Sequence, residues 1–236
     1  MRSSGRGACT GSGPVADAPF PVRDAATIVL MRGQGPDPQV LMGQRGAGAV
    51  FMPSKYVFPG GAVDAGDALV PVGPALHPTC AARLAAPGAP PAGALAAAAI
   101  RELWEETGLA LARPGQAALP PGWAGFAAQG LVPDASALRF FFRAITPPGR
   151  TRRFDARFFL ADAARVIGDP DDFSAASDEL GHLHWLPLSQ ARNLDLPFIT
   201  EVVLAEVAVL AGTEGPPPPV PFFDNSGPVP AFRRIG

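Results

Sequence analysis

The chain has 236 residues, which is enough for one domain with extensions and for a substantial hydrophobic core. Its formal net charge of −2 gives no basis for binding nucleic acid through counterion release. Two cysteines, Cys9 and Cys80, are too few for a disulfide framework, which favours a cytoplasmic location, and no apolar run is long enough for a membrane helix.

The first part of the chain divides into a tail and a hairpin. Residues 1–21 are rich in Gly, Ser, Ala and Pro and contain one aromatic residue, Phe20, so we expect a disordered N-terminal tail. Residues 25–31 form a continuous apolar run with β-branched members, and residues 39–45 form a second run after a Pro-Asp-Pro turn. The two runs predict a buried hairpin at the start of a domain that spans residues 22–212.

The loop after this hairpin carries three candidate substrate contacts. Arg45, at the end of the second run, is either a solvated charge or a phosphate contact. Phe51 and Met52 lie between turn residues, so they either pack on the sheet or form an apolar lip of a substrate groove. Downstream, Gly60 and Gly61 follow a short apolar strand and permit a close approach of the backbone to a ligand.

Residues 68–93 form a Pro-rich segment. Its six prolines exclude long regular structure, although residues 79–86 can make two helical turns with Thr79 as the N-cap. We expect this segment to loop outward from the domain.

Residues 94–107 predict a helix with three carboxylates on one side. Glu102 lies one turn from Glu105 and Glu106, and Gly108 can end the helix in a left-handed conformation. Like charges at this spacing repel, and the negative end of the helix dipole adds to the cost. Arg101 can neutralise only part of this charge, so the pattern favours binding of a hard cation over a merely solvated acidic face.

The second half of the chain predicts further strands and a covering helix. Residues 138–146, 156–161 and 182–186 have strand patterns, and residues 196–210 have apolar residues at helical spacing. Residues 213–236 open with Gly-Thr-Glu-Gly followed by four prolines, so we expect a Pro-rich C-terminal tail.

The Gly-rich loop and the acidic helix together resemble the Nudix box, G-x5-E-x7-R-E-U-x-E-E-x-G-U, in which U is apolar. Gly61 matches the first glycine, and Asp67 stands where the family usually has Glu. The second half of the box matches at every position, with Arg101, Glu102, Leu103, Glu105, Glu106, Gly108 and Leu109. The spacer differs, because 33 residues separate Asp67 from Arg101 where the pattern has seven. The resemblance implies an α+β protein with the Nudix fold, an α/β/α sandwich around a mixed central sheet.

A long insert within the box, Asp67 and the Phe-Met-Pro segment at residues 51–53 are together similar to one subgroup, the peroxisomal coenzyme A diphosphatase-like Nudix proteins and their bacterial relatives. Residues 152–161, which read Arg-Arg-Phe-Asp-Ala-Arg-Phe-Phe-Leu-Ala, resemble a strand of that subgroup.

The resemblance implies hydrolysis of a nucleoside diphosphate derivative with Mg²⁺ or Mn²⁺, most of all coenzyme A or acyl-CoA to 3′,5′-ADP and (acyl-)phosphopantetheine. The implied metal ligands are Glu102, Glu105, Glu106 and the carbonyl of Gly60, with Arg101 holding Glu105 in place. Either Glu102 or Glu179 is the general base, and Glu179 is favoured. Arg152 and Arg153 are candidates for the 3′-phosphate, and Phe51, Met52 and the three phenylalanines of residues 140–142 for the thiol arm. The arginine pair can equally be solvated, and the three phenylalanines can equally be core residues on both faces of a strand.

Two other functions remain open at this point. The same chemistry can act on ADP-ribose or another nucleoside diphosphate derivative, and some Nudix-fold domains bind nucleotides without turnover. The expected partner is therefore a small nucleotide, with no nucleic acid and no membrane, and a homodimer is a candidate assembly.

Overall fold

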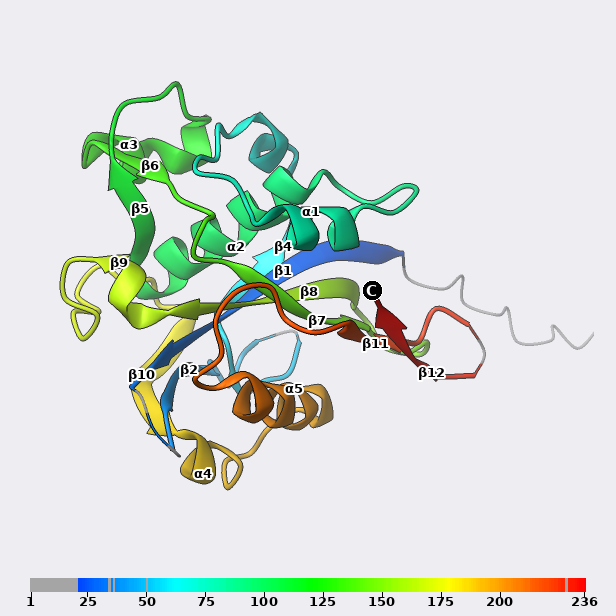
Figure 1. Ribbon diagram of the computed structural model, residues 1–236. Coiled ribbons are helices and arrows are strands. Elements are labelled where there is room, and N and C mark those ends of the chain that lie inside the picture. The colour runs from blue at the N-terminus through cyan, green and yellow to red at the C-terminus, as the bar shows by residue number, and fades with distance from the viewer. Residues whose placement is uncertain (1–20, 34, 36, 50, 228) are drawn as a thin grey trace, which may run out of the picture.

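The computed structural model describes residues 21–33, 35, 37–49, 51–227 and 229–236. The predicted N-terminal tail, residues 1–21, lies outside the described residues except for Pro21. A mixed sheet lies between two layers of helices (Figure 1). Its strands are β1 (Val22–Arg32), β2 (Gln39–Arg45), β3 (Tyr56–Val57), β4 (Gly60–Ala62), β7 (Arg139–Ile145), β8 (Arg153–Asp162), β10 (Leu180–Pro187), β11 (Val220–Asp224) and β12 (Ala231–Ile235).

The strand order is β10-β2-β1-β8-β7-β11-β12, with β3 beside β2 and β4 beside β1. The predicted hairpin is confirmed, because β1 and β2 pair antiparallel. β1 and β8 are parallel, so the sheet is mixed. A smaller sheet has the order β6-β5-β9, from β5 (Ala110–Pro114), β6 (Leu131–Pro133) and β9 (Val166–Ile167).

Helices cover both faces of the main sheet. The α-helices are α1 (Pro78–Leu84), α2 (Ala92–Thr107), α3 (Ala124–Ala128), α4 (Leu188–Ala191) and α5 (Phe198–Leu210), and the 3-10 helices are η1 (Ala65–Leu69), η2 (Pro121–Trp123) and η3 (Ala163–Arg165). In Figure 1, α1, α2 and α3 lie on one side of the sheet, and α4 and α5 lie on the other. None of the helices in the described ranges combines the length and the apolar character that crossing a bilayer requires.

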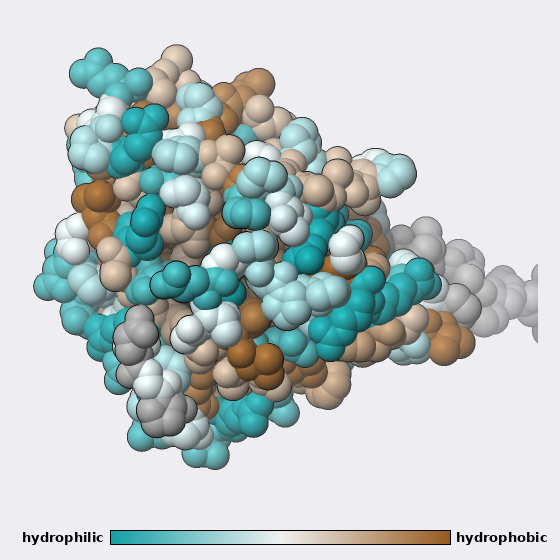
Figure 2. All heavy atoms as spheres, in the orientation of Figure 1, coloured by the Kyte–Doolittle hydropathy of each residue, from teal (hydrophilic) through white to brown (hydrophobic). Residues whose placement is uncertain are grey.

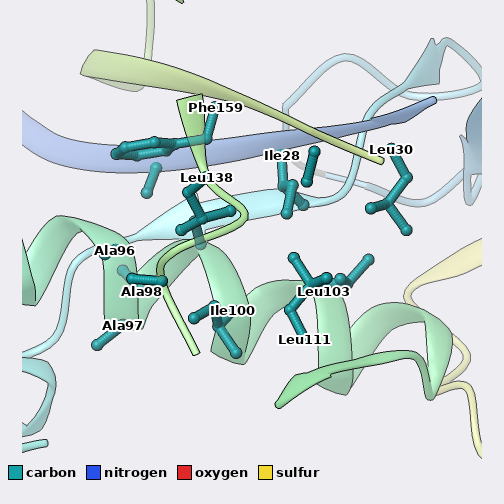
Figure 3. Close-up of a cluster of buried hydrophobic side chains, with 14 of the residues drawn as sticks. Ile28, Leu30, Ala96, Ala97, Ala98, Ile100, Leu103, Leu111, Leu138 and Phe159 are labelled. Atoms are coloured by element: carbon teal, nitrogen blue, oxygen red, sulfur yellow. The ribbon is translucent and has the colours of Figure 1, made fainter. Parts of the chain in front are cut away.

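The helix α2 packs closely on the sheet because its first turns are made of small residues. The six consecutive alanines or leucines of residues 94–99 are all buried. Further along, Ile100 and Leu103 face Ile28 and Leu30 of β1 (Figure 3). The helix ends where Gly108 adopts a left-handed φ of 77° and donates its N–H to the Trp104 carbonyl at 2.9 Å. The acidic end of α2 is therefore fixed relative to the sheet.

The Pro-rich insert differs from the expectation that it loops outward. Its helix α1 buries Cys80 and Leu84 in the core on the α2 side of the sheet. The predicted cap is also wrong, because the Nδ1 atom of His77, rather than the side chain of Thr79, accepts a hydrogen bond at the helix start, from the Thr79 N–H at 3.2 Å. Pro78 occupies the first helical position, where a missing N–H costs nothing.

The C-terminal segment forms part of the sheet, whereas the sequence predicted a tail over residues 213–236. β11 pairs in parallel with β7, and β12 pairs antiparallel with β11. Val220 is fully buried in the core beside α2. The run of prolines before Val220 concealed the short apolar strand that follows it, because Pro-rich composition is typical of surface arms.

Candidate active site

The Gly-rich loop lies directly against the acidic end of α2. β4 pairs antiparallel with β1, and the Gly60 N–H donates a hydrogen bond to Oε2 of Glu106 at 2.8 Å. A Cβ atom added at Gly61 would lie 2.4 Å from Oε1 of Glu102, so a larger residue cannot occupy this position without displacing the carboxylate. The insert therefore leaves the loop and the helix in contact.

Arg101 organises this contact from a buried position. Its guanidinium makes two hydrogen bonds to Asp67, both 3.0 Å long, and a third to the Ala62 carbonyl at 2.9 Å. Burial opposes its charge, but the hydrogen bonds and negative charges of Asp67 and Glu102 raise the pKa of Arg101 above its usual range. Arg101 thus ties η1, the Gly-rich loop and α2 together.

The sequence predicted Glu105 as the partner of Arg101. The structure shows this contact together with contacts to Glu102 and Asp67. Nη1 of Arg101 lies 3.1 Å from Oε2 of Glu105 and 2.8 Å from Oε1 of Glu102, while Asp67 takes the two-pronged contact. The sequence analysis noted Asp67 at the acidic position of the Nudix box but gave it no role in the site. That position in the box was the signal from which its role could have been predicted.

Burial and mutual repulsion make Glu102 and Glu106 difficult to ionise. Burial is the largest cause that raises the pKa of Glu102 to about 7, and Glu105 and Glu179 add to it while Arg101 opposes it. Burial also raises the pKa of Glu106 well above its ordinary value, against the hydrogen bond from Gly60. Glu105 is the more exposed member, with 44% of its side chain accessible.

Glu179 reaches this cluster from the loop before β10. Ser177 N–H of that loop donates to the Glu105 carbonyl at 3.1 Å, and Gly108 leaves room for Ala175 beside the end of α2. The Glu179 carboxylate accepts a hydrogen bond from Nη2 of Arg45 at 3.0 Å. Arg45 is therefore more than a solvated charge, because it stands beside the cluster and pairs with the candidate base.

The donor set suits a hard divalent cation. Asp67, Glu102 and Glu105 contact one guanidinium, and Glu106 lies near Glu102. Carboxylate and carbonyl oxygens are the preferred ligands of Mg²⁺. Within the described part of the chain, no three acidic, histidine or cysteine side chains stand ready to enclose an ion. Glu102 and Glu105 are paired with Arg101, and Glu179 is paired with Arg45.

The two candidate phosphate-binding arginines do not join this cluster. Arg153 pairs with Val22 on β1, whereas Gly60 pairs with Thr27 five residues further along the strand. Its buried side chain donates to the carbonyls of Thr146 and Asn225, at 3.1 and 3.2 Å. The substrate role expected for Arg153 is therefore replaced by a structural one. Arg152 is exposed at the start of the same strand.

Asp155 and Arg157 of this strand form a second cluster of charges with Asp24 of β1 and Arg143 of β7, and we call this cluster the β8 network. Arg143 makes two hydrogen bonds to the Asp155 carboxylate, at 2.8 and 2.6 Å. Arg157 pairs with Asp24 and lies 3.3 Å from Asp155. The network joins β1, β8 and β7. The resemblance of residues 152–161 to the subgroup therefore reflects residues that hold the sheet together.

The apolar candidates pack on the scaffold as well. The ring of Phe51 lies edge-on to Phe154 of β8, with centroids 5.5 Å apart. Met52 is partly buried and has a positive φ of 51°. The three phenylalanines of residues 140–142 are buried on both faces of the sheet. For Phe51, the structure favours packing on the sheet over a substrate lip.

Comparisons with known proteins extend this picture. No family model and no curated protein matches the chain. A solved structure of a NUDIX hydrolase from Alicyclobacillus acidocaldarius is 30% identical, with a TM-score of 0.60, over 84% of this chain and 99% of that one. An Ap4A hydrolase of C. elegans, solved as a binary complex, is 18% identical over 81% of this chain and 100% of that one, with a TM-score of 0.46. The NUDIX domain of Shewanella oneidensis NrtR, complexed with ADP ribose, is 13% identical over 79% and 86%, also with a TM-score of 0.46.

Proposed function

Because the chain belongs to the Nudix hydrolase family, we propose that it cleaves the diphosphate linkage of coenzyme A or an acyl-CoA with the help of Mg²⁺ or Mn²⁺. The products are 3′,5′-ADP and (acyl-)phosphopantetheine. The observation that carries hydrolysis is the excess of buried carboxylate around Arg101, held against a glycine loop. The choice of coenzyme A rests on the insert, Asp67 and the strand at residues 152–161, which resemble the coenzyme A diphosphatase-like subgroup.

The acidic cluster provides the ligands for the cation. Glu102, Glu105, Glu106 and the Gly60 carbonyl would hold it, and Arg101, fixed by Asp67, keeps Glu102 and Glu105 in place. The bound ion would neutralise the diphosphate oxygens and acidify the attacking water. This chemistry requires carboxylates that stay ionised at neutral pH, and a nearby cation favours that state for Glu102 and Glu106.

Glu179 is the group that we assign as the general base. It stands on a loop anchored to the end of α2 and lies near enough to Glu102 and Glu106 to raise the pKa of both. Arg45 is paired with Glu179 here, and its buried Nε has no hydrogen-bond partner in the described part of the chain. Arg45 can therefore donate to a phosphate oxygen of the substrate in addition to Glu179.

The test is a panel of diphosphate substrates with separation of the products. CoA, acetyl-CoA, ADP-ribose and Ap4A are incubated with Mg²⁺ or Mn²⁺, using wild type and Glu105→Gln. Glu214→Gln is the matched control, because Glu214 is exposed and lies outside the cluster. We expect 3′,5′-ADP from CoA with wild type and the control, and little with Glu105→Gln.

Two outcomes would change the proposal. Cleavage of ADP-ribose with CoA left intact would replace the substrate but keep the chemistry. Tight nucleotide binding without turnover of any substrate would replace the enzyme activity by nucleotide sensing.

A further inference from the structure

The helix α5 is apolar on two faces. Its inner face packs on the sheet through Val203, Leu204, Val207 and Leu210, all of which are buried. A second stripe has Phe198, Val202, Ala205 and Val209 at the i, i+4, i+7 and i+11 positions. Val202 and Ala205 in the middle of this stripe are partly buried, and Val202 also packs against the core. Phe198 is 66% exposed and Val209 is 70% exposed. A helix that only covers a sheet has a polar outer face, so this stripe indicates a further contact.

The apolar stripe continues onto the C-terminal hairpin. The ring of Phe223 lies 6.2 Å from that of Phe198 and 6.4 Å from that of Phe232, measured between centroids. Phe223 and Phe232 are direct partners in the β11–β12 ladder, so both rings lie on the α5 side of the sheet. Figure 2 shows apolar surface over α5 and at the turn between β11 and β12. We call this continuous area the α5–β12 surface: Phe198, Val202, Ala205, Val209, Phe232 and the flanking charges.

The charges on this surface are separated by sign. α5 carries Glu201 and Glu206 and no basic residue, whereas β12 carries Arg233 and Arg234 and no acidic residue. Arg233 is within 3.5 Å of Asp224, but Arg234 lies on the same side of the strand as Phe232 and has no carboxylate partner among the described residues. β12 is also the last strand of the sheet in the described chain.

We propose that a second copy of the chain binds the α5–β12 surface about a twofold axis. An isologous contact presents the same area twice, so the area must complement itself. The separated charges satisfy this condition, because Glu201 of one copy can meet Arg234 of the partner subunit while the apolar centres pack together. An acidic surface would be complementary only to β12, and a basic partner only to α5.

The first test measures mass in solution for the full chain. Light scattering after size exclusion, at concentrations on the order of 1 to 100 µM, spans the range of typical specific dimers. We expect wild type at twice the 24.3 kDa of one chain and Val209→Glu at the mass of one chain. Leu69→Glu is the matched control, because Leu69 is 74% exposed in η1, on the α2 side of the sheet, and its variant should stay dimeric.

The second test examines the pairing of charges. Glu201→Arg and Arg234→Glu should each weaken the dimer about tenfold, whereas the variant with both substitutions should return to within about threefold of wild type. Circular dichroism shows whether each variant keeps its fold, which is expected at these exposed positions. A wild-type monomer at about 100 µM would overturn the proposal. Recovery of the wild-type chain as a single copy bound to another molecule would also overturn it. A double variant no tighter than the single ones would overturn the charge pairing.

Discussion

The acidic cluster and the β8 network are both groups of largely buried charges, and both include residues of the family sequence patterns. They differ in charge balance, because only the acidic cluster has more carboxylates than guanidiniums. In the β8 network, two guanidiniums meet two carboxylates. In the acidic cluster, Arg101 contacts Asp67, Glu102 and Glu105, and Glu106 adds a further carboxylate near Glu102. A buried charge is costly unless it is paired, so the balanced group stabilises the sheet as it stands. The unbalanced group needs a ligand of opposite charge.

The comparison teaches that a matching motif does not by itself identify a binding site. Arg153 and Arg157 lie in the most recognisable strand, yet their hydrogen bonds go to the protein itself. The useful signal is the charge that remains after every internal contact is made. Substitutions in either group of charges test this difference.

Glu106→Gln should have the largest effect. We expect the rate of diphosphate hydrolysis to fall by about a thousandfold, because a proposed ligand of the cation is lost. The thermal stability of the metal-free protein should not fall, since the substitution removes a repelling charge. Activity within about tenfold of wild type would show that the acidic cluster is not the reaction centre.

Asp155→Asn should have the opposite signature. Removal of one partner from the buried β8 network leaves Arg143 and Arg157 incompletely paired, which should lower the free energy of unfolding by about 3 to 5 kcal/mol. Hydrolysis per folded molecule should not change. Urea denaturation gives the stability, and Asp169→Asn serves as the exposed control, since an amide oxygen can keep its turn hydrogen bond.

The stability of the metal-free protein should decrease as the pH rises. Glu102 has a pKa of about 7 in the fold against an ordinary value of 4.5, so its contribution is complete below about pH 4.5 and is lost as the pH passes 7. The shift corresponds to roughly 3 kcal/mol at most. Urea denaturation in EDTA at about pH 5 and pH 8 measures it, and Mg²⁺ should restore stability at the higher pH. Equal stability at both values, or the same change in Glu102→Gln, would contradict this account.

Glu179→Gln should have the smallest of these effects. Loss of a general base typically lowers the rate about a hundredfold, and the acid limb of the pH–rate profile should flatten. Arg45→Gln should instead act mainly on KM, because Arg45 is assigned to a phosphate oxygen. If Glu179→Gln leaves the pH profile unchanged, the base must be sought at Glu102.

Periodicity and turn chemistry made much of the fold predictable. The strand expected at residues 39–45 coincides with β2, and the helix expected at residues 94–107 lies within α2. β11 escaped prediction because four prolines precede it and its partner, β7, lies far away in the sequence. Local patterns carry no information about such a pairing.

For the candidate site, the grouping of Glu102, Glu105 and Glu106 on α2 was predictable because helical spacing places them together, and their role as metal ligands stays a prediction. The contacts of Arg101 with Asp67 and of Arg45 with Glu179 join residues 34 and 134 positions apart, so tertiary structure alone reveals them. The same holds for Arg153, whose partners are backbone carbonyls that no side-chain pattern announces.

The length of the insert has a practical consequence for circular permutation and domain insertion. The two halves of the catalytic motif are held together by the guanidinium of Arg101 and the loop at Gly60, and not by the peptide that connects them. The turn at residues 85–88 is exposed and follows the buried end of α1. New termini opened at that turn would leave both halves tethered, which makes it the natural place for circular permutation or for grafting a reporter domain.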